Sequence, residues 1–228
     1  MPTEIVDGVY DITCKHDESY MGGARYRVFL FDGDVPTIID AAFPDTTNRL
    51  IDGIEKTGVV PERLLITHGD GDHIGGYNAL VDRYGVETWV PNNLSVSTRT
   101  EGVGLDTDPD HRFSDGERIG RFEAVHVPGH TEDSYAFVDE RDGIAVMGDV
   151  AMGSDLRGFP PGYFVLPPEV WGGDVNSAER NLEKLLEYEF EVGLVYHGSS
   201  VLEDARDTLE AFVNFPGKVY YETVVRNR

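Results

Sequence analysis

The sequence predicts an α/β fold, in which short buried strands alternate with helices. The order is clearest where a mainly apolar strand at 63–67 is followed by a helix at 77–84 and a second strand at 87–90. This β-α-β order places helices on the faces of a sheet whose strands are buried. The chain has 228 residues, 40% of them hydrophobic, so a single domain over residues 1–228 with a sizeable core is predicted.

The part of the chain before this unit is predicted to be rich in strands. Strands are predicted at 5–14, 26–31 and 37–39, with Gly-containing hairpin turns at 21–23 and 32–34. A helix at about 46–56 follows, because Leu50, Ile51 and Ile54 recur on one face.

The second half repeats the alternation. Strands are predicted at 121–127, 134–139, 143–147 and 192–196, helices from about 176 and over 202–212, and one more strand at 218–225. Asn176 and Glu179 are three residues apart, which predicts a capping pair for the first of these helices. The segment 157–173 is rich in Pro, Gly and aromatic residues, so it is too broken for regular structure and too apolar for a solvated loop.

The charge of the chain excludes several classes of partner. Nineteen Lys and Arg against forty-two Asp and Glu give a net charge of −23. A field of this sign repels nucleic acid and anionic lipid, so a small-molecule substrate is expected and neither nucleic acid nor a membrane. Acid-rich, Lys-poor surfaces are typical of proteins from salt-loving organisms, where counterions screen the repulsion. A halophilic, haloarchaeal source is therefore predicted, with an acidic mesophilic protein as the alternative.

The N-terminus and the single cysteine limit the remaining possibilities. The first residues have neither the basic nor the apolar region of a signal peptide, and no apolar run reaches the roughly 18–20 residues of a membrane span. A cytoplasmic location is therefore expected.

The only cysteine, Cys14, cannot form an internal disulfide or a thiolate cage, so it is predicted to be a core-facing strand residue. Any bound metal must then rely on His and carboxylates.

Seven candidate metal ligands lie in four places along the chain, each just after a predicted strand. They are His68, Asp70, Asp72, His73, His130, Asp149 and His197. Polar groups at strand ends are held by a rigid scaffold yet stand clear of the core, and active sites of α/β folds are built in this way. A lone His is more often a surface or core residue, and an Asp-Gly pair is more often a turn. The prediction therefore depends on the whole set.

Four of these candidates lie in one glycine-rich loop, residues 68–76. Their side chains can converge only if the backbone bends sharply, and Gly69 and Gly71 are predicted to permit that bend. Gly75 and Gly76 are predicted to let the loop pass closely beneath the site. Of the other histidines, His126 lies inside an apolar strand and is expected to pack there or to support a ligand.

The loop reads Thr-His-Gly-Asp-Gly-Asp-His from Thr67 to His73, followed by Ile-Gly-Gly. Further on, the chain has Val-Pro-Gly-His-Thr at 127–131, Gly-Asp at 148–149 and a strand-end His197, and Asp40 follows an early strand. This pattern resembles the metallo-β-lactamase superfamily, whose signature loop reads Thr-His-x-His-x-Asp-His. The resemblance covers roughly residues 5–215. It implies a four-layer αβ/βα sandwich of two mixed β-sheets flanked by helices.

Carried over by position, the resemblance implies a site for two divalent metal ions. His68, Asp70 and His130 would hold the first metal, Asp72, His73 and His197 the second, Asp149 would bridge both, and Asp40 would orient a ligand. Zinc is the first expectation. One departure matters, because Asp70 stands where the family usually has His. A carboxylate is a harder donor than imidazole, so iron or manganese stay open as alternatives.

The resemblance also implies an activity. A metal-dependent hydrolase of a small ester, thioester or lactone is expected, acting through a metal-bound hydroxide. Asp72 is expected to steer the proton. Tyr163 is expected to offer a hydroxyl to the substrate from an apolar wall over the metals. That wall would consist of Phe159, Tyr163, Phe164, Leu166 and Trp171. The alternative is that these residues complete the core or a dimer contact.

Two other classes of function stay open. A non-haem iron oxidoreductase, of the sulfur dioxygenase or di-iron type, is suggested by Asp70, since the di-iron flavoproteins of this superfamily also carry an acid there. A non-catalytic binding protein with a relict site is the third hypothesis. A homodimer is open as well, because the tail 218–225 has strand character and could pair across a dimer or inside one chain.

Overall fold

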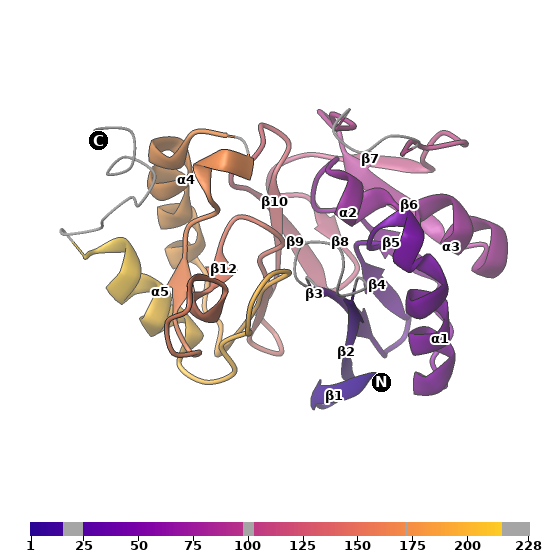
Figure 1. The fold of residues 1–228 in the computed structure, drawn as a ribbon, viewed down its shortest axis with the longest axis horizontal. Coiled ribbons are helices and arrows are strands. Elements are labelled where there is room, and N and C mark those ends of the chain that lie inside the picture. Colours follow the sequence, from indigo (N-terminus) through magenta and orange to yellow (C-terminus); the bar gives the residue numbers. More distant parts are fainter. Residues whose placement is uncertain (16–24, 98–102, 172, 216–228) are drawn as a thin grey trace. The chain divides into compact units, whose positions relative to one another are not determined.

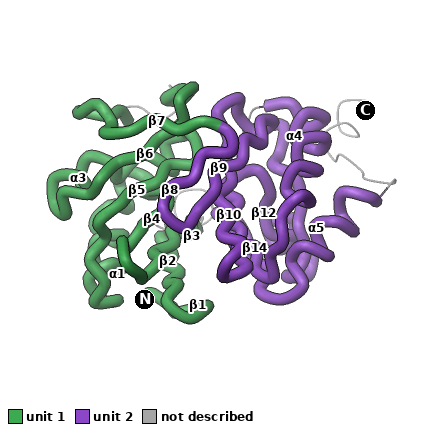
Figure 2. Tube along the Cα trace, turned by 180° about the vertical axis from the view of Figure 1, so that it is seen from behind, with its two compact units in different colours: residues 1–114 green, residues 115–228 purple. Residues whose placement is uncertain are grey.

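The computed structural model describes residues 1–15, 25–97, 103–171 and 173–215. The turn predicted at 21–23 and the strand predicted at 218–225 lie outside these residues. The chain divides into two compact units, residues 1–114 and 115–228, which are coloured separately in Figure 2. A single domain over residues 1–228 stays a prediction.

The first unit is built on a seven-stranded sheet in which the strands follow chain order (Figure 1). The strands are β1 (Thr3–Val6), β2 (Val9–Lys15), β3 (Arg25–Phe31), β4 (Thr37–Ile39), β5 (Arg63–Leu65), β6 (Glu87–Pro91) and β7 (His111–Phe113). Neighbours pair antiparallel from β1 to β4 and parallel from β4 to β7. Parallel neighbours need a crossover, and helices supply it between β4 and β6.

The helices of the first unit are α1 (Thr47–Thr57), α2 (Gly71–Ile74) and α3 (Tyr77–Tyr84). α1 buries Leu50 and Ile54, as its pattern predicts, and ends at Gly58 in the left-handed conformation (φ 79°). It packs closely on β2, because a Cβ atom at Gly53 would overlap the side chain of Ile12. The short α2 was not predicted, since four residues are too few to show a helical period.

The prediction of one continuous strand at residues 5–14 was wrong. The apolar pattern of residues 5–14 belongs to two strands, β1 and β2, which pair antiparallel. Asp7 and Gly8 form the turn between them, and Gly8 has a positive φ of 68°. Asp-Gly is a strong signal for a two-residue hairpin, and it overrides the continuous apolar pattern. Cys14 lies on β2 with no exposed surface, which confirms its prediction as a core residue, and burial raises the pKa of its thiol to about 12.

The second unit has a five-stranded sheet in the order β14-β11-β10-β9-β8. Its strands are β8 (Arg118–Ile119), β9 (Phe122–His126), β10 (Tyr135–Asp139), β11 (Ile144–Val146) and β14 (Val192–Leu194). β11 and β14 are parallel, whereas the other neighbours are antiparallel. A separate antiparallel pair, β12 (Met152–Gly153) and β13 (Phe164–Val165), lies between β11 and β14 in the chain.

The helices of the second unit are α4 (Val175–Leu182) and α5 (Ala205–Val213), with 3₁₀ turns η2 (Ser154–Arg157), η3 (Glu169–Trp171) and η4 (Glu183–Glu187). The predicted capping pair of Asn176 and Glu179 was wrong. The N-cap is Asp174, whose side chain accepts from the backbone N–H groups of Asn176 and Ser177. The N-cap therefore lies two residues before the predicted one, because the helix begins at Val175, directly after Asp174.

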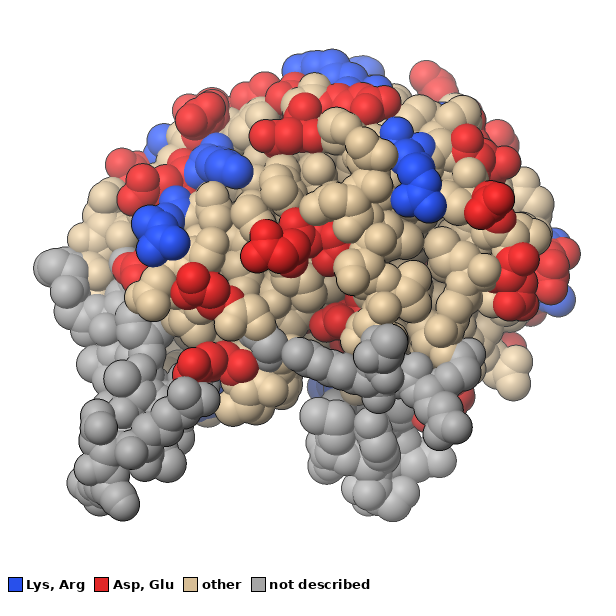
Figure 3. Space-filling view, turned by 90° about the horizontal axis from the view of Figure 1, so that it is seen from above, with Lys and Arg blue, Asp and Glu red and all other residues tan. Residues whose placement is uncertain are grey.

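Each unit therefore combines a mixed sheet with flanking helices, which confirms the α/β class. The core of the second unit includes Val138, Ala145, Leu182 and Leu209, drawn from sheet and helices together. Among the described residues, no helix has the length and apolarity that crossing a membrane would require. On the face shown in Figure 3, acidic side chains are scattered widely among fewer basic ones, in keeping with the net charge of −23.

Candidate metal centre

In the first unit, the candidate ligands leave the carboxyl ends of two parallel neighbours. Asp40 directly follows β4, and the loop from Thr67 follows β5. Because the carboxyl ends of parallel strands meet at one edge of a sheet, residues 27 positions apart in the chain come into contact. The sheet therefore supplies both the loop and the acid that supports it.

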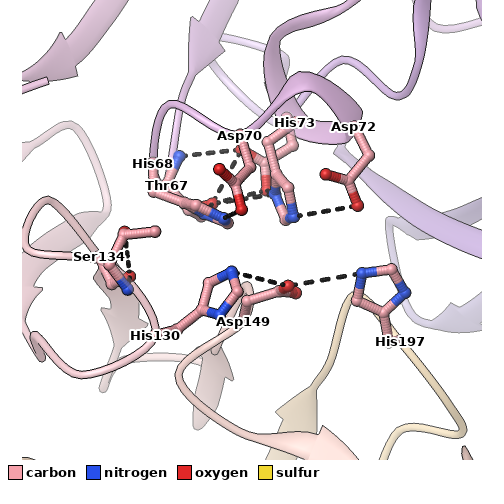
Figure 4. A network of polar contacts seen from close by, with 11 residues as sticks. Thr67, His68, Asp70, Asp72, His73, His130, Ser134, Asp149 and His197 are labelled. Atoms are coloured by element: carbon pink, nitrogen blue, oxygen red, sulfur yellow. Dashed lines mark hydrogen bonds and ion pairs between the residues drawn. The ribbon is translucent and has the colours of Figure 1, made fainter. Parts of the chain in front are cut away.

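The four candidates of this loop form two facing pairs (Figure 4). His68 Nε2 lies 3.8 Å from Asp70 Oδ2, and His73 Nε2 lies 3.8 Å from Asp72 Oδ2. The two imidazole rings are 3.9 Å apart between centroids. Both histidine side chains are fully buried, whereas those of Asp70 and Asp72 are 18% and 16% exposed. Two imidazole nitrogens and two carboxylates thus gather within one loop.

Asp40 and Thr67 fix the orientation of both rings. The Asp40 carboxylate accepts from the Thr67 backbone N–H at 2.8 Å and from its hydroxyl at 2.9 Å, and it lies 2.8 Å from His73 Nδ1. An ionised carboxylate only accepts, so His73 Nδ1 and the Thr67 hydroxyl must both donate to it. The Thr67 oxygen, 3.1 Å from His68 Nδ1, is then placed to accept from that ring.

This network assigns the tautomers. Each ring carries its proton on Nδ1 and directs the lone pair of Nε2 toward an aspartate, which is the arrangement that a metal-binding histidine requires. The structure confirms that Asp40 contacts one of the predicted ligands. Thr67 is part of the loop pattern in the sequence, but its central place in the network was not predicted. Its position between a buried strand and His68 was the available signal.

The backbone around this loop is held by close contacts. Asp40 itself has a left-handed φ of 66° while only 1% exposed, an uncommon conformation for a residue other than Gly. The Ala41 N–H donates to the His73 carbonyl at 2.7 Å. Added Cβ atoms at Gly75 and Gly76 would overlap residues 41–44, which confirms the close passage predicted there.

The predicted role of Gly71 was wrong. Gly71 begins α2, so a helical turn brings Asp72 and His73 together. Gly69 is needed for a different reason than the one predicted, because a Cβ atom there would overlap the Ser95 backbone. Neither glycine has a positive φ. A four-residue helix and a close approach replace the expected sharp bend.

In the second unit, three candidate ligands leave one edge of the five-stranded sheet (Figure 4). Asp149 follows β11 and His197 follows β14, its parallel neighbour. His130 follows β9, which is antiparallel to β10 and therefore runs in the same direction as β11. The carboxyl ends of all three strands thus lie at the same edge.

Asp149 lies between the two histidines. Its Oδ2 atom is 3.5 Å from His130 Nε2 and 3.4 Å from His197 Nε2. All three residues are buried, with 3%, 3% and 6% exposed surface for His130, Asp149 and His197. A carboxylate between two imidazole nitrogens is a suitable arrangement for a bridging ligand.

The aromatic wall predicted in the segment 157–173 was partly wrong. Phe164, on β13, and Leu166, directly after it, belong to the hydrophobic core of the second unit. Phe159 and Tyr163 are exposed, each at 62%. Trp171 lies beside a candidate ligand, with its ring 5.2 Å from that of His197. The role of Tyr163 stays a prediction, and the structure places this side chain in a surface hollow beside α5.

The remaining described histidines have other contacts. His126 Nε2 lies 2.8 Å from the Glu132 carbonyl oxygen, and its ring packs against Tyr135 at 4.7 Å. Of the two roles expected for His126, packing in its strand or support of a ligand, the ring contact confirms the packing. His111 lies on β7 with its ring stacked on Trp89 at 4.1 Å.

The donor set suits divalent metal ions. Imidazole nitrogen and carboxylate oxygen are ligands of zinc, iron and manganese alike, and the histidines of the loop are held in the ligating tautomer. Within the described residues the single cysteine lies in the core of the first unit, so no thiolate contributes. The donors of each unit are therefore of the kinds that the implied metal ions take.

Comparison with known proteins adds an independent observation. Residues 25–221 match the family model described as metallo-beta-lactamase superfamily. Hydroxyacylglutathione hydrolase GloC of Haemophilus influenzae is 33% identical over 133 residues, which cover 51% of this chain and 63% of that protein. A hydroxyacylglutathione hydrolase of Chromohalobacter salexigens is 36% identical over 104 residues, covering 46% of this chain and 37% of that protein. The chain therefore spans less than two thirds of these curated relatives.

Solved structures show the same fold. A metallo-beta-lactamase from Pontibacter korlensis is similar with a TM-score of 0.71 and 18% identity, and the match covers 100% of this chain and 99% of that one. At this identity the likeness concerns the fold alone. It confirms the predicted fold class of two mixed sheets flanked by helices.

Proposed function

Since the chain belongs to the metallo-β-lactamase superfamily, we propose that it is a metal-dependent hydrolase that cleaves a small thioester. The observation that carries the proposal is the arrangement of His68 and His73, whose Nδ1 atoms are engaged by Thr67 and Asp40 so that Nε2 is presented for ligation. The thioester is preferred over an ester or a lactone because two relatives are named hydroxyacylglutathione hydrolases.

We propose that the two sets of donors act together on two metal ions. The first ion would be held by His68, Asp70 and His130, the second by Asp72, His73 and His197, and Asp149 would bridge the two. The family match supports this pairing because it spans both sets within residues 25–221. Bound divalent ions would supply Lewis acidity toward the acyl carbonyl and would lower the pKa of a water molecule.

The chain's own residues would orient the reactants and move the proton. Asp72 has a partly exposed carboxylate 3.8 Å from His73, and it is placed to accept a proton from the attacking water. Water adds to the acyl carbon and gives a proton to Asp72, and the carbon–sulfur bond breaks. The sulfur takes that proton from Asp72 and leaves as a thiol, and the acyl group leaves as a carboxylic acid. Asp40 keeps His73 in its ligating tautomer throughout. Tyr163 is retained as a candidate hydroxyl donor to the substrate.

Zinc remains the first choice of metal, with iron or manganese as alternatives. Asp70 adds a carboxylate where the family usually has imidazole, which favours harder ions. Its side chain faces His68 as a ligand at that position would. The oxidoreductase alternative gains no support from the named relatives, which are hydrolases. A cytoplasmic location, a homodimer and the absence of nucleic-acid or membrane partners stay predictions from the sequence.

The test begins with protein stripped of metal and reconstituted with zinc in molar KCl. We expect about two bound ions per chain, as a two-metal site requires. We also expect hydrolysis of a 2-hydroxyacyl glutathione thioester that stops on chelation and returns with metal. A lactone and a carboxylic ester in the same assay rank the substrate classes. Metal-loaded protein that leaves all three intact would contradict the proposal, and so would hydrolysis that persists without metal.

A further inference from the structure

The loop that follows Asp149 is fastened to the turn that carries His197. The Gly153 N–H donates to the His197 carbonyl at 2.9 Å. Two residues later, the Asp155 carboxylate accepts two hydrogen bonds from Ser199. Its Oδ1 accepts from the backbone N–H at 2.7 Å, and its Oδ2 accepts from the hydroxyl at 2.8 Å. Because both oxygens are engaged by one residue, Asp155 holds Ser199 in a defined orientation.

The two segments approach each other backbone to backbone. Gly198 has a left-handed φ of 81°, and a Cβ atom there would lie 2.7 Å from the Gly153 carbonyl oxygen. A Cβ atom at Gly153 would in turn overlap the Ser199 backbone. Only glycine fits both positions, so residues 153–155 and 197–199 form one packed unit.

The base of the turn is closed by separate bonds. Gly193 and Val201 exchange backbone hydrogen bonds at 2.7 and 2.9 Å, and the Val195 N–H donates to the Ser200 hydroxyl at 3.2 Å. These bonds lie at the base of the turn, whereas residues 197–199 form its tip. The tip is held by hydrogen bonds to Gly153 and Asp155. Ser199 and Ser200 thus lie in one turn and bond to different partners.

The segment that begins at Gly153 comes close to His197 again near Trp171. Asp155 lies in η2, which opens the aromatic segment, and Trp171 near its end places its ring 5.2 Å from that of His197. Shortly afterwards the Asp174 N–H donates to the Gly129 carbonyl at 2.8 Å, next to His130. The segment between residues 153 and 174 is therefore attached to the turns of two candidate ligands.

We propose that Asp155 is a positioning residue that sets where the His197 imidazole lies by anchoring Ser199. Asp155 is exposed and contacts the turn beyond His197 through Ser199, so it acts on His197 through the backbone. The consequence for metal binding rests on the proposed function. Weakening this anchor should lower the affinity of the one ion that His197 helps to hold.

Four variants separate the effect of the hydrogen bonds between Asp155 and Ser199 from the effect of the negative charge of Asp155. Asp155→Ala removes both hydrogen bonds, and Ser199→Ala removes only the one from the hydroxyl. Asp155→Asn keeps the shape, since its amide oxygen can accept from the Ser199 N–H and its NH₂ can donate to the hydroxyl. Glu203→Ala, at an exposed position in the same unit, makes the same charge change as Asp155→Ala away from this turn.

Hydrogen exchange of metal-free protein tests the anchor directly. In Asp155→Ala we expect the Ser199 amide to exchange at least about tenfold faster, with amides of β11 and β14 unchanged, because only the local bond is lost. Asp155→Asn should stay near the wild type. Equal Ser199 exchange in Asp155→Ala and in the wild type would overturn the proposal. This measurement decides the anchor even if the wild type proves to bind no metal, which would refute only the proposed function.

Zinc titration against a competing chelator tests the consequence. We expect Asp155→Ala to lose about 10–100-fold in affinity for one of the two ions, the range typical for partners that orient metal ligands, and to keep the other. Ser199→Ala should lose less, and Asp155→Asn should recover most of the affinity. Wild-type affinity in Asp155→Ala would overturn the proposal. An equal loss in Glu203→Ala or in Asp155→Asn would also overturn it, because charge alone would then explain the effect.

Discussion

The two halves of the proposed metal centre, one in each unit, are constructed differently. In the first unit, four donors come from six consecutive residues, and Asp40, which follows the neighbouring strand, contacts one of them, His73. In the second unit, three donors come from three strand ends separated by 19 and 48 positions in the sequence, at residues 130, 149 and 197. Local chain geometry assembles the first half, whereas sheet topology assembles the second.

This difference predicts where each half is vulnerable. The loop of the first unit depends on one hydrogen-bond network centred on Asp40 and on glycines that let it pass beneath the strand ends. The second half depends on strand register and on backbone contacts such as the one between residues 153–155 and 197–199. Substitutions that act on these features separately can test whether the halves are independent.

The largest effect is expected from Asp149→Ala, because this carboxylate lies between two histidines and would bridge both ions. Thioester hydrolysis should fall by more than about 100-fold, beyond the 10–100-fold range of outer partners. Metal content by elemental analysis should drop for both ions together. His73→Ala serves as the comparison and should release one ion before the other. If Asp149→Ala retained both ions, the bridging assignment would be wrong.

A smaller effect is expected from Asp40→Asn, which leaves every proposed ligand in place. The amide would no longer favour the proton on His73 Nδ1, so zinc affinity should fall about 10–100-fold with the fold retained. Competition with a chelator measures the affinity. Asp52→Asn, an exposed residue on α1, makes the same charge change and should bind like the wild type. Unchanged affinity in Asp40→Asn would show that Thr67 alone can fix the rings.

The glycine positions test the scaffold of each half. Gly75→Ala would force a Cβ atom into Pro44, and Gly129→Ala would force one into Ala178 at a φ of 155°. Each substitution should lower the free energy of unfolding by about 1–3 kcal/mol, as overpacking does. Gly104→Ala is the control, because its Cβ atom would meet nothing within 4 Å. Urea denaturation gives the values, and a loss as large in the control would remove the steric explanation.

Salt concentration is expected to change the stability of the two units by similar amounts. The 42 acidic residues occur in both units, and molar KCl screens their mutual repulsion over all of the surface. We expect the thermal midpoint to rise with salt, and hydrogen exchange to slow in both units alike. Stability that did not depend on salt would count against a halophilic source. A response confined to one unit would instead show that the acidic charge acts locally.

Much of the secondary structure could be predicted from the sequence. The helix at 77–84 was predicted to the residue, because apolar periodicity and the glycines at both of its ends agree there. The short strand at 37–39, which ends at Asp40, was also predicted to the residue. The strands β7, β8, β12 and β13 were missed, since two or three residues carry no period. The strand predicted at 5–14 failed where one Asp-Gly turn outweighed a continuous apolar pattern.

The sequence by itself determined the candidate donors, because each stands in a distinctive short pattern: the loop 67–73, Pro-Gly-His at 128–130, Gly-Asp at 148–149 and a histidine after an apolar strand. Only the tertiary structure decided what supports them. That Thr67 lies between two histidine rings, that Phe164 turns into the core, and that Asp155 holds Ser199 across 44 positions depend on contacts between segments distant in the chain. Such contacts leave no periodic trace in the sequence, because they follow from the packing of one backbone against another.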